Sequence, residues 1–226
     1  MLDKPDIVEA ADIILLAIDM LLATSNDQKG RVGSDLRRSC GDMKSYVQSY
    51  IVNNQIAEKL SNCFKQAQLS GATLDEFDRI RSAVDAEMPT SLLATLMQQA
   101  CISYALQQMA IVIVGMKFTS RDDVDVIRLS INEAFSAAEE YAADAMAQAT
   151  YIALIALHAA VVFYLYQTAR PLPRMLRFEF GAIRPTLVLS HRLYYSASHA
   201  DELREENKVV HPAFAPRAGR ALSPQN

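Results

Sequence analysis

The chain has 226 residues, of which 51% are hydrophobic and 21% charged, so it is long and apolar enough to form a sizeable core. Its 7 glycines and 8 prolines exclude a collagen-like or low-complexity chain and argue against a turn-rich β-sandwich over the whole length. The 3 cysteines, Cys40, Cys63 and Cys101, lie far apart and form no CxxC pair. The sequence therefore predicts neither a disulfide framework nor a structural zinc site.

The net charge of -4 is distributed unevenly along the chain. Residues 1–169 contain 13 basic and 21 acidic side chains, a net charge of -8, whereas residues 170–226 contain 9 and 5, a net charge of +4. Pro171 and Pro173 fall at this change and disfavour continuation of a helix. We therefore predict two domains, a helical bundle with long apolar helices at 1–170 and a small C-terminal module at 171–226.

Local signals predict helices through most of the first domain. The first helix runs from about Pro5 to about Thr24, and its acidic residues argue against a signal peptide. A second helical region covers about 34–70, and Thr73 and Glu76 have the capping-box spacing that begins the next helix. The predicted core positions of the second region are Tyr46, Tyr50, Ile51, Ile56, Leu60 and Phe64.

Residues 89–116 and 145–169 carry no formal charge, and each stretch exceeds the roughly 20 residues that span a hydrocarbon core. Gln99, Ser103 and Gln107 form a polar stripe along the first stretch, which is typical of a bundle helix with one wet face. The second stretch is rich in alanine, which adds little insertion energy. We favour buried helices in a bundle or a subunit interface over two membrane spans, and a membrane-active helical protein stays an alternative.

No glycine or proline interrupts the helical sequence from Arg121 to Ala169. This segment is either one long rod or bends at a place that the sequence does not mark. Its frequent alanines predict close packing against a partner helix. Because so much apolar helix is difficult to bury within one chain, we expect a homo-oligomer that associates through residues 92–113 and 151–166.

The basic C-terminal module changes its hydrophobic period. Apolar Leu176, Phe178 and Phe180 alternate with charged residues, which predicts a half-buried strand that ends at Gly181. Two short helices should follow, the first beginning at Pro185, and a last extended segment completes the order strand, helix, helix, strand. The predicted core residues are Phe178, Leu187, Leu193, Tyr194 and Leu203.

Several residues of this module occur in a distinctive order: Leu172-Pro173-Arg174, Arg184 through Tyr194, Asp201-Glu202-Leu203, Asn207, and His211 through Pro216. They resemble the C-terminal part of the DNA circularisation (circulation) proteins of Mu-like tailed phages, and the order of elements resembles a LysM-like module. The resemblance covers about a quarter of the chain. The resemblance does not extend to the N-terminal domain of that family, so we expect either a divergent short member or a corresponding unit encoded elsewhere.

The resemblance implies a structural virion protein of a contractile phage tail, at or near the baseplate hub, assembled in the host cytoplasm. Its partners would be other tail and baseplate proteins, and it would not be an enzyme. Ala182-Ile183 and Tyr195 replace the Asp-Thr pair and the glycine of glycan-binding LysM units, so peptidoglycan binding is not favoured.

The expected docking contacts combine arginines with exposed aromatic rings, which are common in protein interfaces. The candidate interface residues are Arg174, Arg177, Phe178, Phe180, Arg184, Arg192 and Phe214. A basic cluster of this kind is also compatible with DNA, but the acidic character of the rest of the chain argues against direct DNA binding.

The remaining polar clusters give no prediction of catalysis, cofactor binding or metal binding. His158 has no acidic residue at i±3 or i±4, so a packed or interface histidine is expected. His199 and Glu202 are three residues apart, without a third metal ligand in sequence. Glu139, Glu140 and Asp144 are interpreted as a solvent-facing acidic patch.

Overall fold

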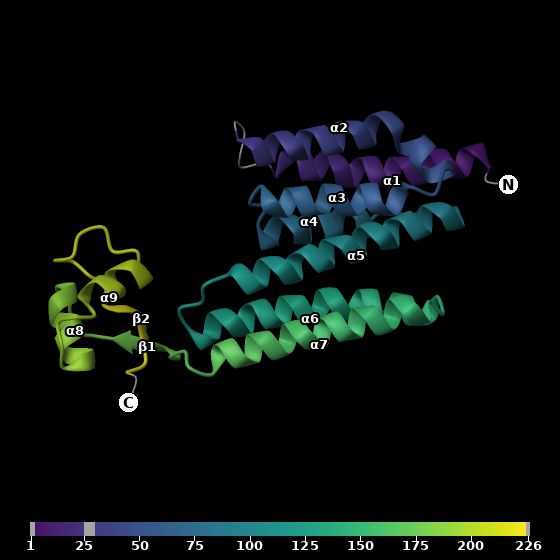
Figure 1. Cartoon of the computed structure of the whole chain (residues 1–226). Helices are drawn as coiled ribbons and strands as arrows, with labels where there is room; N and C mark the ends of the chain where they lie inside the picture. Colours follow the sequence, from purple (N-terminus) through teal and green to yellow (C-terminus); the bar gives the residue numbers. More distant parts are fainter. Residues whose placement is uncertain (1–2, 25–29, 225–226) are drawn as a thin grey trace. The chain divides into compact units, whose positions relative to one another are not determined.

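A computed structural model describes residues 3–24 and 30–224, which are mainly α-helical (Figure 1). The elements in order are α1 (Lys4–Ala23), α2 (Arg31–Val52), α3 (Ile56–Leu69), α4 (Leu74–Asp85), α5 (Leu92–Gly115), α6 (Arg121–Asp144), α7 (Gln148–Ala169), β1 (Met175–Glu179), α8 (Thr186–Tyr194), α9 (Ala200–Glu206) and β2 (Ala218–Leu222). The mainly α fold class is therefore confirmed.

The chain divides into two compact units, whose boundary differs from the expected one. The helical unit contains Met1–Met116 and Ser130–Val162, and the C-terminal unit contains Lys117–Leu129 and Phe163–Asn226. The C-terminal unit thus takes in the end of α7 and the start of α6 as well as the module. The domain boundary predicted at residue 170 coincides with the change of charge along the chain. It does not coincide with the division into the two compact units.

The helical unit is built around α5, which packs against α1, α3 and α4, while α1 also packs against α2 (Figure 1). The largest fully buried side chains are Phe64, Phe77, Phe135, Ile14, Ile18, Leu21, Leu36, Met43, Leu60, Ile80, Leu106 and Met109. The apolar side chains of these helices therefore form a close-packed hydrophobic core.

Several helix starts follow the local signals. Pro5 lies in the first turn of α1. At α4, the Glu76 backbone N–H donates to the Thr73 hydroxyl at 3.3 Å, and the Thr73 N–H donates to the Glu76 carboxylate at 2.7 Å, so the predicted capping box is present. At α5, the Ala94 N–H donates to the Ser91 hydroxyl at 3.2 Å. These caps satisfy N–H groups that have no partner within the helix.

Two long helical regions contain breaks that the sequence analysis did not place. The region 34–70 is divided between α2 and α3, and Asn54 between them has φ 54°. The region from Arg121 to Ala169 is divided between α6 and α7, and Met146 in the connection also has φ 54°. Asparagine tolerates this left-handed conformation, but methionine does so only at a cost of about 1–2 kcal/mol, so packing of the helices must offset it.

The predicted core of the second region is largely correct. Ile51, Ile56, Leu60 and Phe64 are buried, whereas Tyr46 is 56% exposed and was wrongly placed in the core. Tyr46 instead lies on the surface with its ring centroid 6.2 Å from that of Tyr50.

The polar stripe of α5 is partly exposed, as expected for a wet face: Gln107 is exposed, and Gln99 and Ser103 are half-buried. Gln98, which the stripe did not include, is buried and donates to the carbonyls of Val84 and Glu87 at 2.8 Å each. Gln98 therefore connects α5 to the C-terminal end of α4 and to the segment that follows it.

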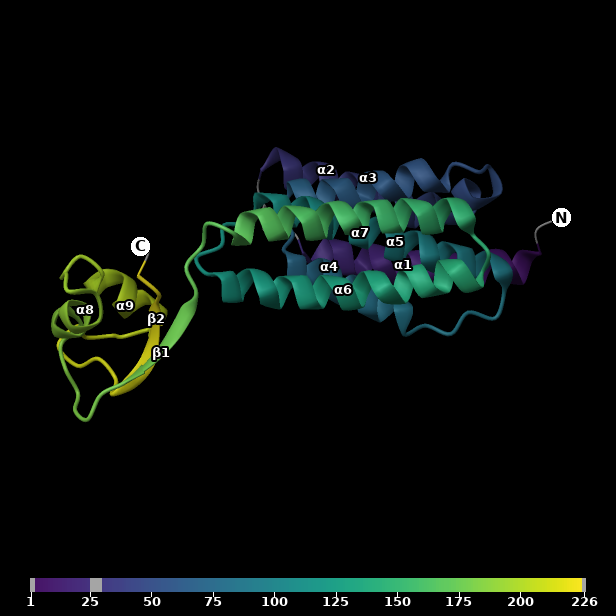
Figure 2. The same ribbon diagram turned by 90° about the horizontal axis from the view of Figure 1, so that it is seen from below.

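The C-terminal module has the predicted order of strand, helix, helix and strand. β1 and β2 pair antiparallel, with Phe178 opposite Gly219, and lie side by side in Figure 2. The buried core consists of Phe178, Leu189, Leu203, Ala215 and Ala221. Leu193 and Tyr194 pack against this core, but Leu187 is 59% exposed, so its predicted core position was wrong. Leu189 lies on the inward face of α8 instead.

Candidate functional site

The module is held together by polar contacts between segments that are distant in sequence. The Asn207 side-chain amide donates to the carbonyls of Leu203 and Arg220 at 2.8 Å each, and its oxygen accepts from the Arg220 N–H at 2.7 Å. The Tyr194 hydroxyl donates to the Leu222 carbonyl at 2.8 Å. Burial, together with the negative charge of Glu202, raises the pKa of Tyr194 to about 12, so this donor keeps its proton. Both contacts fix the helices to β2.

Gly219 is required by the close packing of the sheet. A Cβ atom at this position would collide with Oδ1 of Asn207 and lie 2.8 Å from the ring of Phe178. The glycine therefore allows Asn207 and Phe178 to approach β2 from two sides.

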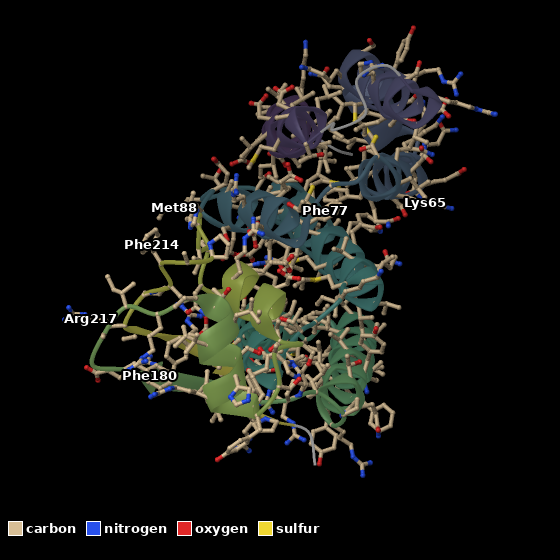
Figure 3. The ribbon with its side chains drawn as sticks, turned by 90° about the vertical axis from the view of Figure 1, so that its left-hand side faces the viewer. Lys65, Phe77, Met88, Phe180, Phe214 and Arg217 are labelled. Carbon is tan, nitrogen blue, oxygen red and sulfur yellow. The ribbon has the colours of Figure 1, made fainter. Side chains whose placement is uncertain are left out.

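The structure divides the seven predicted interface residues into exposed and internal positions. Arg174, Arg177, Arg192 and Phe214 are exposed, and Phe214 is 69% exposed. Figure 3 shows Phe180 and Phe214 on the C-terminal module together with Arg217. Phe180 packs against the module core and is half-buried.

Two of the predicted interface residues have internal roles. Phe178 is 8% exposed and belongs to the module core, so its assignment as a docking contact is corrected. The reason is that β1 turns Phe178, and not its neighbours, toward α8 and α9. The Arg184 carbonyl accepts from the Ala215 N–H at 3.0 Å, and the side chain is half-buried with a buried Nε that has no partner among the described residues.

A basic hollow lies in the C-terminal unit, where the start of α6 meets the end of α7 and the following segment. Its volume is about 390 Å³, and we call it the arginine hollow. The residues that line it are Arg121, Asp125, Arg128, Tyr166, Ala169, Arg170 and Arg174. Four arginines and one aspartate give this concave surface a positive charge.

Arg121 is fixed in place by backbone carbonyls. Its Nε donates to the Leu172 carbonyl at 2.8 Å, and its Nη2 donates to the Arg170 carbonyl at 2.7 Å. The backbone N–H of Arg121 also donates to the Pro173 carbonyl at 2.9 Å. Segment 170–173 is therefore held to the first residue of α6.

The first turn of α6 carries carboxylates that already have partners. Asp122 accepts from the Met175 N–H at 2.7 Å. Asp123 accepts from the Ser120 N–H at 3.0 Å and the Thr119 hydroxyl at 2.9 Å. Burial opposes ionisation of Asp123, but these hydrogen bonds outweigh it and lower its pKa. The predicted serine cap at Ser120 is present, because its hydroxyl accepts from the Asp123 N–H at 3.2 Å.

The sequence analysis did not assign Arg121 and Arg128 to a site. They are seven residues apart and so lie near one another along one helix face, and this spacing was the available signal. Their proximity to Arg170 and Arg174 depends on a contact between segments about 50 residues apart, which no local pattern encodes.

His158 forms a polar contact between α6 and α7. Its Nδ1 lies 2.9 Å from Glu139 and its Nε2 lies 3.0 Å from Asn132, and its ring stacks on Phe135 with centroids 4.9 Å apart. The expectation of a packed histidine is confirmed. Glu139, however, is a half-buried partner of this histidine and not part of a solvent-facing patch, whereas Glu140 and Asp144 are exposed.

His199 pairs within its own helix start. Its Nδ1 lies 2.9 Å from a Glu202 oxygen, and its ring lies 4.3 Å from that of Tyr194. Within residues 3–24 and 30–224, no group of three or more His, Cys, Asp and Glu side chains could hold a metal ion.

The three cysteines are buried free thiols. A hydrogen bond with Cys40, followed by burial, raises the pKa of the Cys63 thiol well above its usual range. Burial raises the pKa of Cys101 to about 12. The thiols of Cys63 and Cys101 are therefore protonated at neutral pH, and all three cysteines are buried.

α7 exposes a long apolar face. Of the helices in the described part of the chain, α7 is the one long and apolar enough to cross a membrane, with a mean hydropathy of 1.8 and 17% of the apolar window buried. Ile152 is 57%, Phe163 64% and Tyr166 59% exposed. The stretch 145–169 was expected to be buried in a bundle or an interface, and within one chain it is largely exposed, unlike α5.

No protein-family model matches this sequence, and no curated protein matches it.

Proposed function

We propose that this chain is a structural protein of a contractile phage tail, at or near the baseplate hub, that docks to neighbouring tail proteins. The supporting observation is the position of the residues that carry the phage-family resemblance. Arg174, Asn207 and Pro212 each form a cross-segment hydrogen bond: the carbonyl of Arg174 accepts from the Ser223 N–H at 2.7 Å, and that of Pro212 accepts from the Thr186 N–H at 2.8 Å. Three of the residues that carry the resemblance thus connect separate segments of the module.

A LysM-like architecture is part of the same proposal. An antiparallel pair of strands encloses two consecutive helices in sequence, and Asn207 follows the second helix. Tyr195, which replaces a LysM glycine, has φ 57° and is 88% exposed. Such a left-handed position is one that glycine adopts without strain, which is consistent with the resemblance.

Docking is favoured over glycan binding for this module. Its exposed surface offers Arg177, Arg192 and Phe214, whereas Ala182 and Ile183 supply no polar side chain after Gly181. Arginine and aromatic side chains are enriched at protein interfaces. The partners proposed are therefore other tail or baseplate proteins, and not peptidoglycan or DNA.

The proposal also includes association of the chain with a second copy of itself through its apolar helices. α5 also has exposed apolar residues, among them Leu92 at 76% and Leu96 at 53%. Surfaces of this kind in a water-soluble assembly are commonly covered by a partner. A second copy of the chain is the proposed partner of these helices.

Mass spectrometry of purified phage particles tests the assignment directly. The chain should be present in the virion at a fixed copy number. Deletion of residues 171–226 should leave a helical protein, judged by circular dichroism, that no longer enters the particle. Phe214→Ala should reduce incorporation, and Val210→Ala, which changes a side chain that is 95% exposed, should not. Absence of the chain from particles, or normal incorporation of the deletion variant, would contradict the proposal.

A membrane-active helical protein is the second candidate, and the apolarity of α7 is the observation that favours it. Flotation with liposomes distinguishes the two candidates. Stable association that resists high salt and alkali favours the membrane function, whereas a water-soluble oligomer without lipid association favours the tail protein.

A further inference from the structure

We propose that the arginine hollow binds an acidic segment of a neighbouring polypeptide through its aspartate or glutamate carboxylates. This inference rests on the proposed docking function, since it names the chemistry of the docked partner. The site is built from the ends of two long helices and the segment that leads into β1. Of the seven predicted interface residues, it includes Arg174.

Two guanidinium groups in the hollow are available for a ligand. The side chains of Arg170 and Arg174 are exposed and form no hydrogen bond or ion pair with any described residue. Arg121 between them is held by the carbonyls of Leu172 and Arg170, so it keeps its place without a ligand. A guanidinium group matches a carboxylate with two parallel N–H···O bonds. Arg121, whose position is fixed, and Arg170 and Arg174, whose side chains have no partner among the described residues, can therefore contact the same anion.

Arg128 adds a donor that lacks a partner. Its Nη2 lies 2.8 Å from Asp125, but its Nε is buried and has no hydrogen-bond partner in the described part of the chain. A buried donor without a partner is unfavourable, so an acceptor on a bound segment would stabilise it. Asp125 neutralises part of the positive charge, so a small number of carboxylates would balance the site.

The shape of the surface favours an extended peptide over an isolated anion. A second hollow of about 430 Å³ shares Arg121 and Arg174 with the first. Its walls are formed by Pro171, Leu172, Pro173, Ser223 and Pro224. Proline-lined walls beside a cluster of arginines suit a short extended segment, whose carboxylates reach the arginines while its backbone lies along the prolines.

The distribution of charge favours carboxylates over a nucleic-acid backbone. Asp122, Asp123 and Asp125 lie in the first turns of α6, directly beside the arginines. A continuous phosphate backbone would pass close to these carboxylates, and the like charges would repel it. A short acidic segment places its negative charge only in the hollow. We therefore assign the site to a protein partner.

Fluorescence anisotropy with the full-length protein and a labelled hexaglutamate peptide tests the assignment. Hexaglutamate should bind, hexaglutamine should not, and binding should weaken as the salt concentration rises from about 0.05 to about 0.5 M because the charges are screened. The variant Arg170→Ala/Arg174→Ala should lose affinity by about tenfold or more, since it removes two charge-assisted contacts.

The matched control is Arg204→Ala/Arg217→Ala, which removes the same charge from exposed positions outside both hollows. This control should bind hexaglutamate within about twofold of the unmodified protein. Circular dichroism and thermal unfolding should match for both variants, because neither pair of side chains supports the core.

Three results would overturn the assignment: no binding of hexaglutamate at low salt, equal loss in the two double variants, or tighter binding of a six-nucleotide single-stranded DNA than of hexaglutamate. The last result would assign the hollow to nucleic acid. Presence or absence of the chain in phage particles is a separate observation, so failure of the tail proposal and failure of this site are distinguishable.

Discussion

The helical unit and the C-terminal module are stabilised in different ways. The helical unit buries many large side chains, including Phe64 and Phe77, whose ring centroids are 6.5 Å apart. Among the described residues of the module, five apolar side chains form the buried core, and contacts from the side chains of Asn207 and Tyr194 to the backbone of β2 support it. A large apolar core therefore does not depend on any single polar contact. The small core of the module, in contrast, depends on the contacts of Asn207 and Tyr194 and on Gly219.

The largest effect on stability is expected from Phe64→Ala in the helical unit. Phe64 is 0% exposed and lies between Phe77 and Tyr104, so its truncation should lower the free energy of unfolding by about 3–5 kcal/mol. Chemical denaturation followed by circular dichroism measures the loss. Val52→Ala, at a position that is 58% exposed, serves as the control and should change the free energy by less than about 0.5 kcal/mol.

Leu203→Ala should lower the free energy of unfolding slightly less than Phe64→Ala does. It should, however, disrupt more of the structure around it, because the module is small. Leu203 is 1% exposed in the five-residue core, and its truncation should cost about 2–5 kcal/mol, which a module of this size can hardly tolerate. Hydrogen exchange of the full-length protein should show lost protection in β1 and β2 with little change in α1 to α5. Protection should persist in Leu187→Ala, because Leu187 is exposed. Equal protection in both variants would mean that Leu203 is not essential to the module.

Gly219→Ala tests the close approach of Asn207 and Phe178 to β2. The added methyl group should destabilise the module by about 1–3 kcal/mol, because both neighbours must shift. A double-mutant cycle with Asn207→Ala measures the coupling. Removal of the Asn207 side chain should make the Gly219→Ala change less costly, and strictly additive effects would exclude the proposed collision.

The smallest effect concerns Glu9, which binds the start of α5 to α1. Its carboxylate accepts from the N–H groups of Thr90 and Ser91 at 2.6 and 2.9 Å. Hydrogen bonds from Ser91 and then Thr90 lower the pKa of Glu9 from 4.5 to about 2. Because the folded protein prefers the ionised form, this contribution to stability is complete above pH 4.5 and is lost as the pH falls toward 2.

Thermal unfolding between pH 2 and pH 4.5 should therefore depend less steeply on pH in Glu9→Gln than in the unmodified protein. Glu58→Gln, at an exposed position on α3, removes one carboxylate without these hydrogen bonds and is the control. Identical pH dependence in Glu9→Gln and the unmodified protein would contradict this role of Glu9.

Local sequence patterns identified only part of the candidate site. The charge change near residue 170 directed attention to the basic C-terminal residues, and four of the seven predicted interface residues are exposed. Phe178 was predicted both in the module core and at the interface; the core prediction is confirmed, and the interface prediction is wrong because this face of β1 packs against α8 and α9. Arg121 and Arg128 were missed because their role depends on a contact with segment 170–174, far away in sequence.

The sequence by itself determined the features that depend on interactions between near neighbours. These are the helical class, the first turn at Pro5, the capping box of Thr73 and Glu76, and the order of strand, helix, helix and strand. Tertiary structure decided the breaks near Asn54 and Met146, the pairing of His158 with Glu139, and the assembly of the arginine hollow. Caps and strand alternation act over a few residues, so a short window of sequence contains them. A left-handed Met146 is unfavourable locally, so a short window of sequence does not predict the break between α6 and α7.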